Sequence, residues 1–132
     1  MIYTGNTALV YAGLIQESTA IKDISSWRTK VDGCVAPGVR YLYNPNFDDK
    51  RYLRRLPDNS MTPIAERALV EYIQNEKHRD EFTIIWALQN YLNSEHKNMS
   101  LLYEVADHFN LSREIVDYWV KEAIEENDIS MG

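Results

Sequence analysis

Apolar residues recur with the period of an α-helix through the second half of the chain. The segment TPIAERALVEYIQ, residues 62–74, starts with Thr62 as the expected N-cap and Pro63 at the first helical position. Glu66 lies close to the position that completes a capping box. The apolar stripe of this segment is Ile64, Ala68, Leu69, Tyr72 and Ile73.

Three more helices are predicted beyond this one. Asp80 and Glu81 suit the start of a helix over 80–92, because acidic side chains face the positive end of the helix dipole. The residues expected to face inward from it are Phe82, Ile85, Trp86, Leu88 and Leu92. The last two helices are expected over about 99–109 and 112–127.

The first half of the chain has a mixed pattern. TGNTALVYAGL, residues 4–14, predicts a short helix that ends near Gly13. VRYLYNP (39–45) and KRYLRRLP (50–57) are aromatic-rich, interleave polar residues and end at Pro, which predicts a pair of strands. Residues 19–31 have mixed periodicity and are assigned no element.

The pattern therefore predicts an α+β protein that is mostly helical. A short N-terminal helix precedes a small antiparallel strand pair, and about four helices follow. A length of 132 residues fits a single domain, 1–132. Within it, 1–60 is expected to be the mixed part and 61–132 the helical part.

The last two helices match a helix-turn-helix unit over 99–127. Such a unit needs a small residue where the helices cross, a tight turn and apolar anchors on the second helix. Ala106 is the small residue, and Asn110 takes the turn position because Asn tolerates the left-handed conformation. Leu111 fills the turn and Ser112 caps the next helix, whose inward residues should be Ile115, Val116 and Trp119. The alternative is an ordinary helical hairpin.

Charge is distributed unevenly along the chain. The net charge is −6, which argues against general binding of nucleic acid. Residues 22–55 hold eight basic and four acidic side chains, a balance of +4. Residues 101–128 hold two basic and eight acidic side chains, a balance of −6. The basic segment 22–55 and the acidic segment 101–128 are therefore expected to favour partners of opposite charge.

Basic residues of the predicted strands are the first candidate binding residues. In a strand, Arg51 and Arg55 would share one face with Leu53, and Arg54 would lie on the other. Together with Arg40 they suit phosphates and bases, and equally an acidic protein surface. The alternative is a half-exposed strand whose bases protect its edge.

The second helix of the helix-turn-helix unit gives the other candidates. Its early positions carry Arg113 and Tyr118, which could contact DNA. Glu114 and Asp117 on the same helix would repel phosphates. A solvated acidic face, or a face that docks a basic partner, is therefore favoured over a DNA-reading helix.

Motifs of enzymes and metal sites are missing from the sequence. It contains no Gly-rich phosphate loop, no Gly-x-Ser-x-Gly, no His-Glu-x-x-His and no Cys-x-x-Cys. His78, His96 and His108 lack metal-ligand spacing. We therefore predict a protein that is not an enzyme, with no catalytic residue, metal or cofactor. No apolar run reaches about 18 residues, and no signal-like segment is found, which predicts a cytoplasmic protein that does not insert into membranes.

Residues 4–75 resemble the middle of AbiE-type abortive-infection antitoxins, a family of bacterial transcriptional regulators. TGNTALVYAGL is similar to a family helix that ends at Gly-Leu, and LPDNSMTPIAERALVEYI is similar to a strand followed by a Pro-Glu-Arg-Ala-Leu helix. Ile64 and Ala65, inserted between Pro63 and Glu66, are a departure. The resemblance implies an antitoxin that neutralises a nucleotidyltransferase-like toxin and represses its own promoter. We expect the family's DNA-binding winged helix, which would precede residue 4, to be missing.

These observations predict a non-enzymatic, antitoxin-like bacterial protein that binds a partner protein. The alternative is a sequence-specific DNA-binding regulator that uses residues 101–124. A third, weaker class is an enzyme with an unrecognised site. The sequence leaves open the identity of the partner, the DNA target and whether the chain forms a homo-oligomer.

Overall fold

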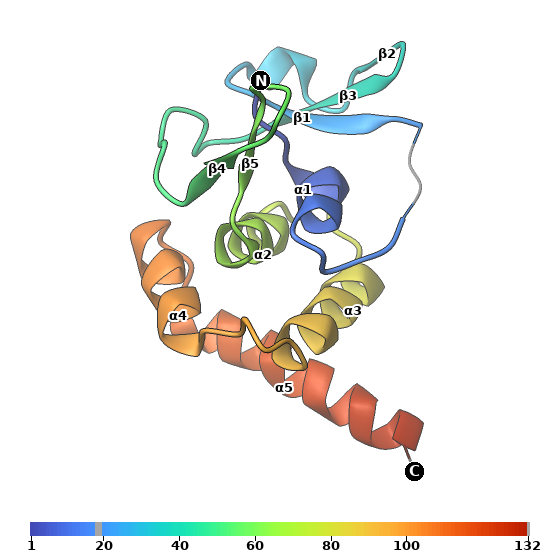
Figure 1. Ribbon diagram of the computed structural model, residues 1–132, viewed down its shortest axis with the longest axis vertical. Helices are drawn as coiled ribbons and strands as arrows, with labels where there is room; N and C mark the ends of the chain where they lie inside the picture. Colours follow the sequence, from blue (N-terminus) through green and yellow to red (C-terminus); the bar gives the residue numbers. More distant parts are fainter. Residues whose placement is uncertain (18–19, 132) are drawn as a thin grey trace.

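A computed structural model describes residues 1–17 and 20–131 (Figure 1). The elements are, in order, α1 (Gly5–Tyr11), β1 (Lys22–Ser26), the 3-10 helix η1 (Thr29–Val31), β2 (Val35–Ala36), β3 (Val39–Tyr43), β4 (Leu53–Arg55), β5 (Met61–Pro63), α2 (Ala65–Gln74), α3 (Glu81–Leu92), α4 (Met99–His108) and α5 (Arg113–Met131). The predicted α+β class, with a short N-terminal helix, a small antiparallel strand pair and a helical second half, is confirmed. No helix of the described residues has the length and apolar character to cross a bilayer.

The strands form two small sheets, and the predicted partners are wrong. β3 pairs in parallel with β1, so that Asp23 lies opposite Arg40, and pairs antiparallel with β2. β4 pairs antiparallel with β5 rather than with β3. The reason is that residues 22–26, which have no clear periodicity, form β1 and pair with β3. This pairing joins residues that are distant in the sequence, so the local pattern does not predict it.

Only part of the predicted strand 50–57 is extended. Tyr52 has a φ of 62°, and the chain before it is a turn. The strand therefore begins at Leu53, and the expected alternation of faces does not include Arg51.

The predicted start of α2 is also wrong. Thr62 and Pro63 belong to β5, and the N-cap is Ile64, which makes no side-chain capping bond. Met61 pairs with β4 and also bridges to Ile2, so strand pairing outweighs the local capping pattern. Thr62 is fully buried.

Helix α3 begins where the sequence predicts, but its inner face differs. The Asp80 carboxylate caps it by accepting the Thr83 N–H at 2.9 Å. Leu88 is buried as expected, whereas Phe82 is 74% exposed. Ile85, Trp86 and Leu92 are half-buried, and the remaining buried positions are Ile84, Ala87 and Tyr91.

The helix-turn-helix geometry agrees with most of the sequence prediction. Asn110 has a φ of 62° in the turn between α4 and α5. Ala106 and Leu111 are buried, and Ser112 Oγ accepts the Ile115 N–H at 3.3 Å. The buried anchors on α5 include Val116 and Trp119. Ile115 is 41% exposed, which corrects its expected inward position.

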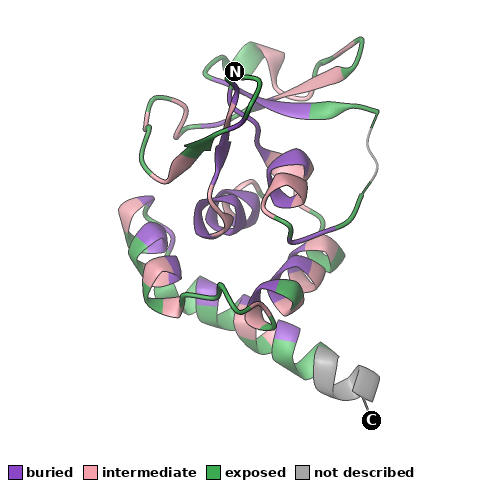
Figure 2. Ribbon diagram, in the orientation of Figure 1, coloured by how far each residue is buried: buried purple, intermediate pink, exposed green. Residues whose placement is uncertain are grey.

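One core joins α1 to the four later helices. It includes Leu9 from α1, Leu69 from α2, Leu88 from α3, Val105 from α4 and Val116 from α5. Figure 2 shows these buried segments facing the middle of the molecule. The strands lie at one end and α5 at the other (Figure 1), while α4, the first helix of the acidic segment, contacts the basic loop through Glu104 and His108.

Candidate partner-binding surface

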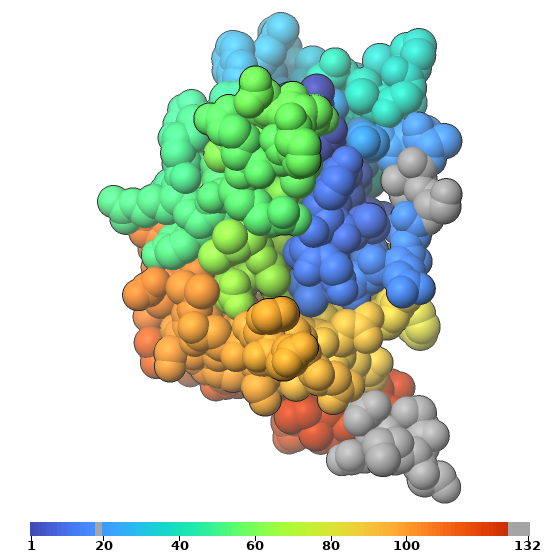
Figure 3. Space-filling view, viewed as in Figure 1, coloured from blue at the N-terminus to red at the C-terminus, as the bar shows by residue number. Residues whose placement is uncertain are grey.

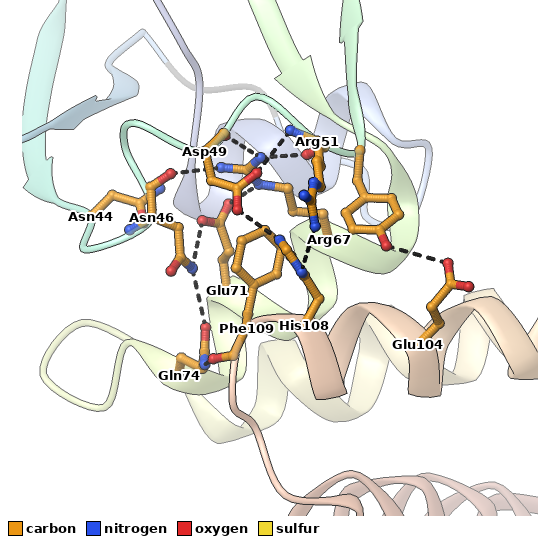
Figure 4. A network of polar contacts seen from close by, with 11 residues as sticks. Asn44, Asn46, Asp49, Arg51, Arg67, Glu71, Gln74, Glu104, His108 and Phe109 are labelled. Carbon is orange, nitrogen blue, oxygen red and sulfur yellow. Dashed lines mark hydrogen bonds and ion pairs between the residues drawn. The ribbon is translucent and has the colours of Figure 1, made fainter.

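The buried guanidinium of Arg67 fixes the loop between β3 and β4. This side chain is fully buried on α2 and donates hydrogen bonds to three backbone carbonyl oxygens of the loop. The distances are 3.1 Å to Asn46, 2.7 Å to Asp49 and 2.5 Å to Arg51. Its Nε lies 3.3 Å from the Glu71 carboxylate one turn later. A buried charge is stable only when it is paired and hydrogen-bonded, and the three bonds to carbonyls hold the loop against α2 (Figure 4).

Two further groups connect this loop to the helices. The Asn46 side-chain amide donates to the second oxygen of Glu71 at 3.1 Å. Gln74 donates to the carbonyl of Phe109 at 2.7 Å, and the Phe109 ring lies 4.8 Å from the Arg67 guanidinium. The loop, α2 and the end of α4 are therefore held by one network (Figure 4).

His108 lies between an acid and a base at the surface of this network. Its Nε2 is 2.6 Å from the Asp49 carboxylate, and its Nδ1 is 3.1 Å from the guanidinium of Arg51. A guanidinium only donates, so Nδ1 accepts and Nε2 carries the hydrogen that it donates to Asp49. Burial alone would raise the pKa of Asp49, but the backbone N–H of Arg51 and the contact with His108 lower it below its usual value.

An open hollow of about 790 Å³ lies over the loop and the end of α4. Its lining is Pro45, Asn46, Asp48, Asp49, Lys50, Arg51, His108, Phe109 and Asn110. None of these residues is a Ser, Thr or Cys that the Asp49–His108 pair could activate. Within the described part of the chain, no three His, Cys, Asp or Glu side chains gather as a metal site requires.

Three of the predicted binding residues lie on or beside β4. Arg54 and Arg55 are exposed. Arg54 donates to the backbone carbonyl of Tyr11, and Arg55 lies 3.4 Å from the side-chain oxygen of Asn59. Neither forms an ion pair with a carboxylate of the described residues. With Arg51 and the exposed Lys50 they make up a basic stretch of the surface, called here the basic face and defined as Lys50, Arg51, Arg54 and Arg55. Arg54 and Arg55 are successive residues of β4, so their side chains leave opposite sides of the strand. In Figure 3 this segment forms part of the visible surface above α4.

Arg40 has a different role. Its guanidinium contacts both carboxylate oxygens of Asp23 on the neighbouring strand, at 2.8 and 3.1 Å. Asp23 is buried and also accepts the backbone N–H of Asn6 at 3.1 Å. Gly5 has a φ of +54°, and a Cβ there would lie 2.7 Å from the Asp23 carboxylate. Arg40 therefore joins β3 to β1 and α1, and its charge is compensated inside the molecule.

Arg113 and Tyr118 lie on α5, apart from the basic face. The guanidinium of Arg113 pairs with Asp107 at 2.9 Å and lies over the ring of Tyr103. The Tyr103 hydroxyl donates to Asp117 on the same surface. Tyr118 is 55% exposed. The positive charge expected to meet a phosphate is thus already paired with an acid.

The central residue of the network, Arg67, is not among the residues predicted from the sequence to bind a partner. From the sequence, Glu66 is expected near the position that completes a capping box, and no contact beyond the helix end is expected for Arg67. Instead, Arg67 pairs with Glu71, and Glu66 accepts the Tyr91 hydroxyl at 2.5 Å. One signal was available: Arg67 and Glu71 are four residues apart in an otherwise apolar segment.

Comparisons with known proteins give no match, either among models of protein families or among curated proteins. The resemblance to AbiE-type antitoxins therefore stays a prediction.

Proposed function

We propose that this chain is a non-enzymatic, antitoxin-like bacterial protein that acts by binding the acidic surface of a partner protein through its basic face. The observation that carries the proposal is the ordered backbone of the basic face: Arg67 fixes the loop that holds Lys50 and Arg51. Pairing of β4 with β5 holds Arg54 and Arg55. Ordering the loop before binding reduces the entropy lost on association. Arginine in such a position is a common anchor of protein interfaces.

A protein partner is supported over a nucleic acid by the surrounding charge. Asp48 and Asp49 lie in the same loop as the basic face, and the whole chain is at −6. A phosphate backbone would meet these carboxylates along its length, whereas a protein surface can match a mixed pattern of charges.

The resemblance to AbiE-type antitoxins supplies the kind of partner. It supports a nucleotidyltransferase-like toxin that the chain would neutralise by direct contact, in the bacterial cytoplasm. No catalytic step is assigned to this chain, because both ring nitrogens of His108 are engaged within the network.

Co-expression with the product of the adjacent gene tests this proposal. We expect the chain to rescue growth and to co-purify with that product. The double variant Arg54→Glu/Arg55→Glu should lose both effects, since it reverses the exposed charge without disturbing Arg67. The matched control Arg113→Glu/Lys121→Glu makes the same charge change on α5 and should retain both. Equal loss in the two variants, or no complex with the unaltered chain, would contradict the proposal.

The alternative is a DNA-binding regulator that uses α4 and α5. The confirmed turn at Asn110 favours it, and the pairing of Arg113 with Asp107 opposes it. An electrophoretic shift with the DNA upstream of the gene, at low and moderate salt, separates the two functions. A shift that is lost in Arg113→Ala would support the regulator. A shift that is lost only in Arg54→Ala would place the DNA on the basic face.

A further inference from the structure

A cleft between α3 and α5 exposes apolar side chains at the acidic end of the molecule. It has a volume of about 370 Å³ and is lined by Phe82, Ile85, Trp86, Gln89 and Glu126. Phe82 is 74% exposed, although its position in the sequence pattern predicts an inward side chain. A large aromatic ring left in water beside half-buried apolar neighbours is characteristic of an interaction site.

The α3–α5 cleft is formed before any partner binds. Gln89 donates to the backbone carbonyl of Ala123 at 3.2 Å, which fixes α3 against α5. Ile85 and Trp86 pack against the main core from the same face of α3. These contacts hold the two walls of the cleft in place in the unbound chain.

Glu126 lines this cleft, and two further acidic residues are close to its lining residues in the sequence. Glu81 precedes Phe82, and Glu122 lies one turn before Glu126 on the same side of α5. None of these three carboxylates forms an ion pair with a basic group of the described residues. An occupant must therefore combine an apolar stripe with positive charge.

We propose that the α3–α5 cleft binds an amphipathic helix of a partner protein, with Lys or Arg flanking its apolar stripe. Large apolar side chains at i, i+3 or i+4 would fill the space beside Phe82 and Trp86, and the basic residues would meet Glu81, Glu122 and Glu126. Phosphate groups of nucleic acid or of an anionic membrane would be repelled. A second copy related by two-fold symmetry would bring two surfaces of the same negative charge together. This surface is separate from the basic face and does not depend on the function proposed for it.

A synthetic peptide provides the test. The probe is a fluorescent helix of about 14 residues made of Leu and Lys, with Leu at i, i+3, i+4 and i+7. We expect it to bind the full chain by fluorescence anisotropy. Phe82→Ser should weaken binding by about tenfold or more, because a central aromatic anchor is lost. Glu122→Lys/Glu126→Lys should weaken it similarly, and Val35→Ser, which replaces a 63% exposed side chain on β2, should not.

Three results would overturn this proposal. The first is equal binding of a scrambled peptide of the same composition, which would show attraction by charge alone. The second is an unchanged affinity in Phe82→Ser, with its circular dichroism spectrum confirming the fold. The third is a dimer in sedimentation that Phe82→Ser dissociates, which would make a second copy the occupant. The variant Arg54→Glu/Arg55→Glu should bind the peptide with unchanged affinity. A failure of the function proposed for the basic face can therefore be told apart from a failure of the α3–α5 cleft proposal.

Discussion

Replacement of Arg67 by Met is expected to be the most damaging single change in the polar network. The substitution keeps most of the side-chain volume but leaves Glu71 buried without its positive partner. Breaking a buried ion pair costs about 3–5 kcal/mol. The carbonyls of Asn46, Asp49 and Arg51 also lose a hydrogen-bond donor. We count one of these three bonds as not replaced by water, which adds about 1 kcal/mol. The total loss is therefore about 4–6 kcal/mol, comparable with the whole stability of a small domain.

Urea unfolding at pH 7, followed by tryptophan fluorescence and circular dichroism, measures this loss. The expected decrease lowers the midpoint by about 2 M or more, if the slope is about 2 kcal/mol per M. Arg67→Met/Glu71→Gln should recover at least about 1 kcal/mol, since no unpaired carboxylate remains. Arg113→Met removes a surface pair and should leave the midpoint unchanged. If Arg67→Met loses less than about 1 kcal/mol, the network does not stabilise the fold as described.

Three other predictions concern single groups. Asn110→Val should cost about 1–2 kcal/mol in urea unfolding because a β-branched residue resists the left-handed conformation, while Asn110→Gly should be close to neutral. Burial favours a raised pKa for Asp32, but the Tyr43 N–H and His78 outweigh it and hold the value at about 2. The folded pKa lies below the unfolded one, so this stabilisation is complete above about pH 4 and is lost as the pH falls toward 2; a carboxyl NMR titration with a midpoint near 4 would contradict this. Tyr91→Phe should cost about 1–3 kcal/mol by leaving a buried carboxylate without its donor, and full stability of that variant in thermal unfolding would refute the assigned bond.

Local signals in the sequence identify the helices well. Asp80 caps α3 because its side chain reaches the Thr83 N–H, and Asn110 forms the turn because of its own backbone preference. Each depends on neighbours within three or four residues, which the sequence displays directly. Gly13 after α1 is a third case, with a φ of 75°.

Strand partners and the central network could not be predicted in the same way. Residues 22–26 become β1 only because β3 lies beside them, and Met61 becomes a strand through pairing with β4. Arg67 is buried because loop carbonyls about twenty positions earlier and Phe109 far downstream surround it. A pattern read over ten residues contains no information about these distant neighbours. The predicted binding residues therefore separate into the basic face, a strand ion pair at Arg40 and a paired surface at Arg113.

The Arg67 network also determines when the protein can finish folding during synthesis. The loop around residues 44–52 leaves the ribosome before its organising side chain on α2. The guanidinium in turn lacks its aromatic neighbour until Phe109 has emerged. In the same way, Ile2 cannot form its bridge to Met61 until Met61 has been synthesised. The loop between β3 and β4 therefore takes its final shape late, after most of the helical half has been made. A nascent chain stalled near residue 60 would present the basic arginines without the order that they have in the folded protein.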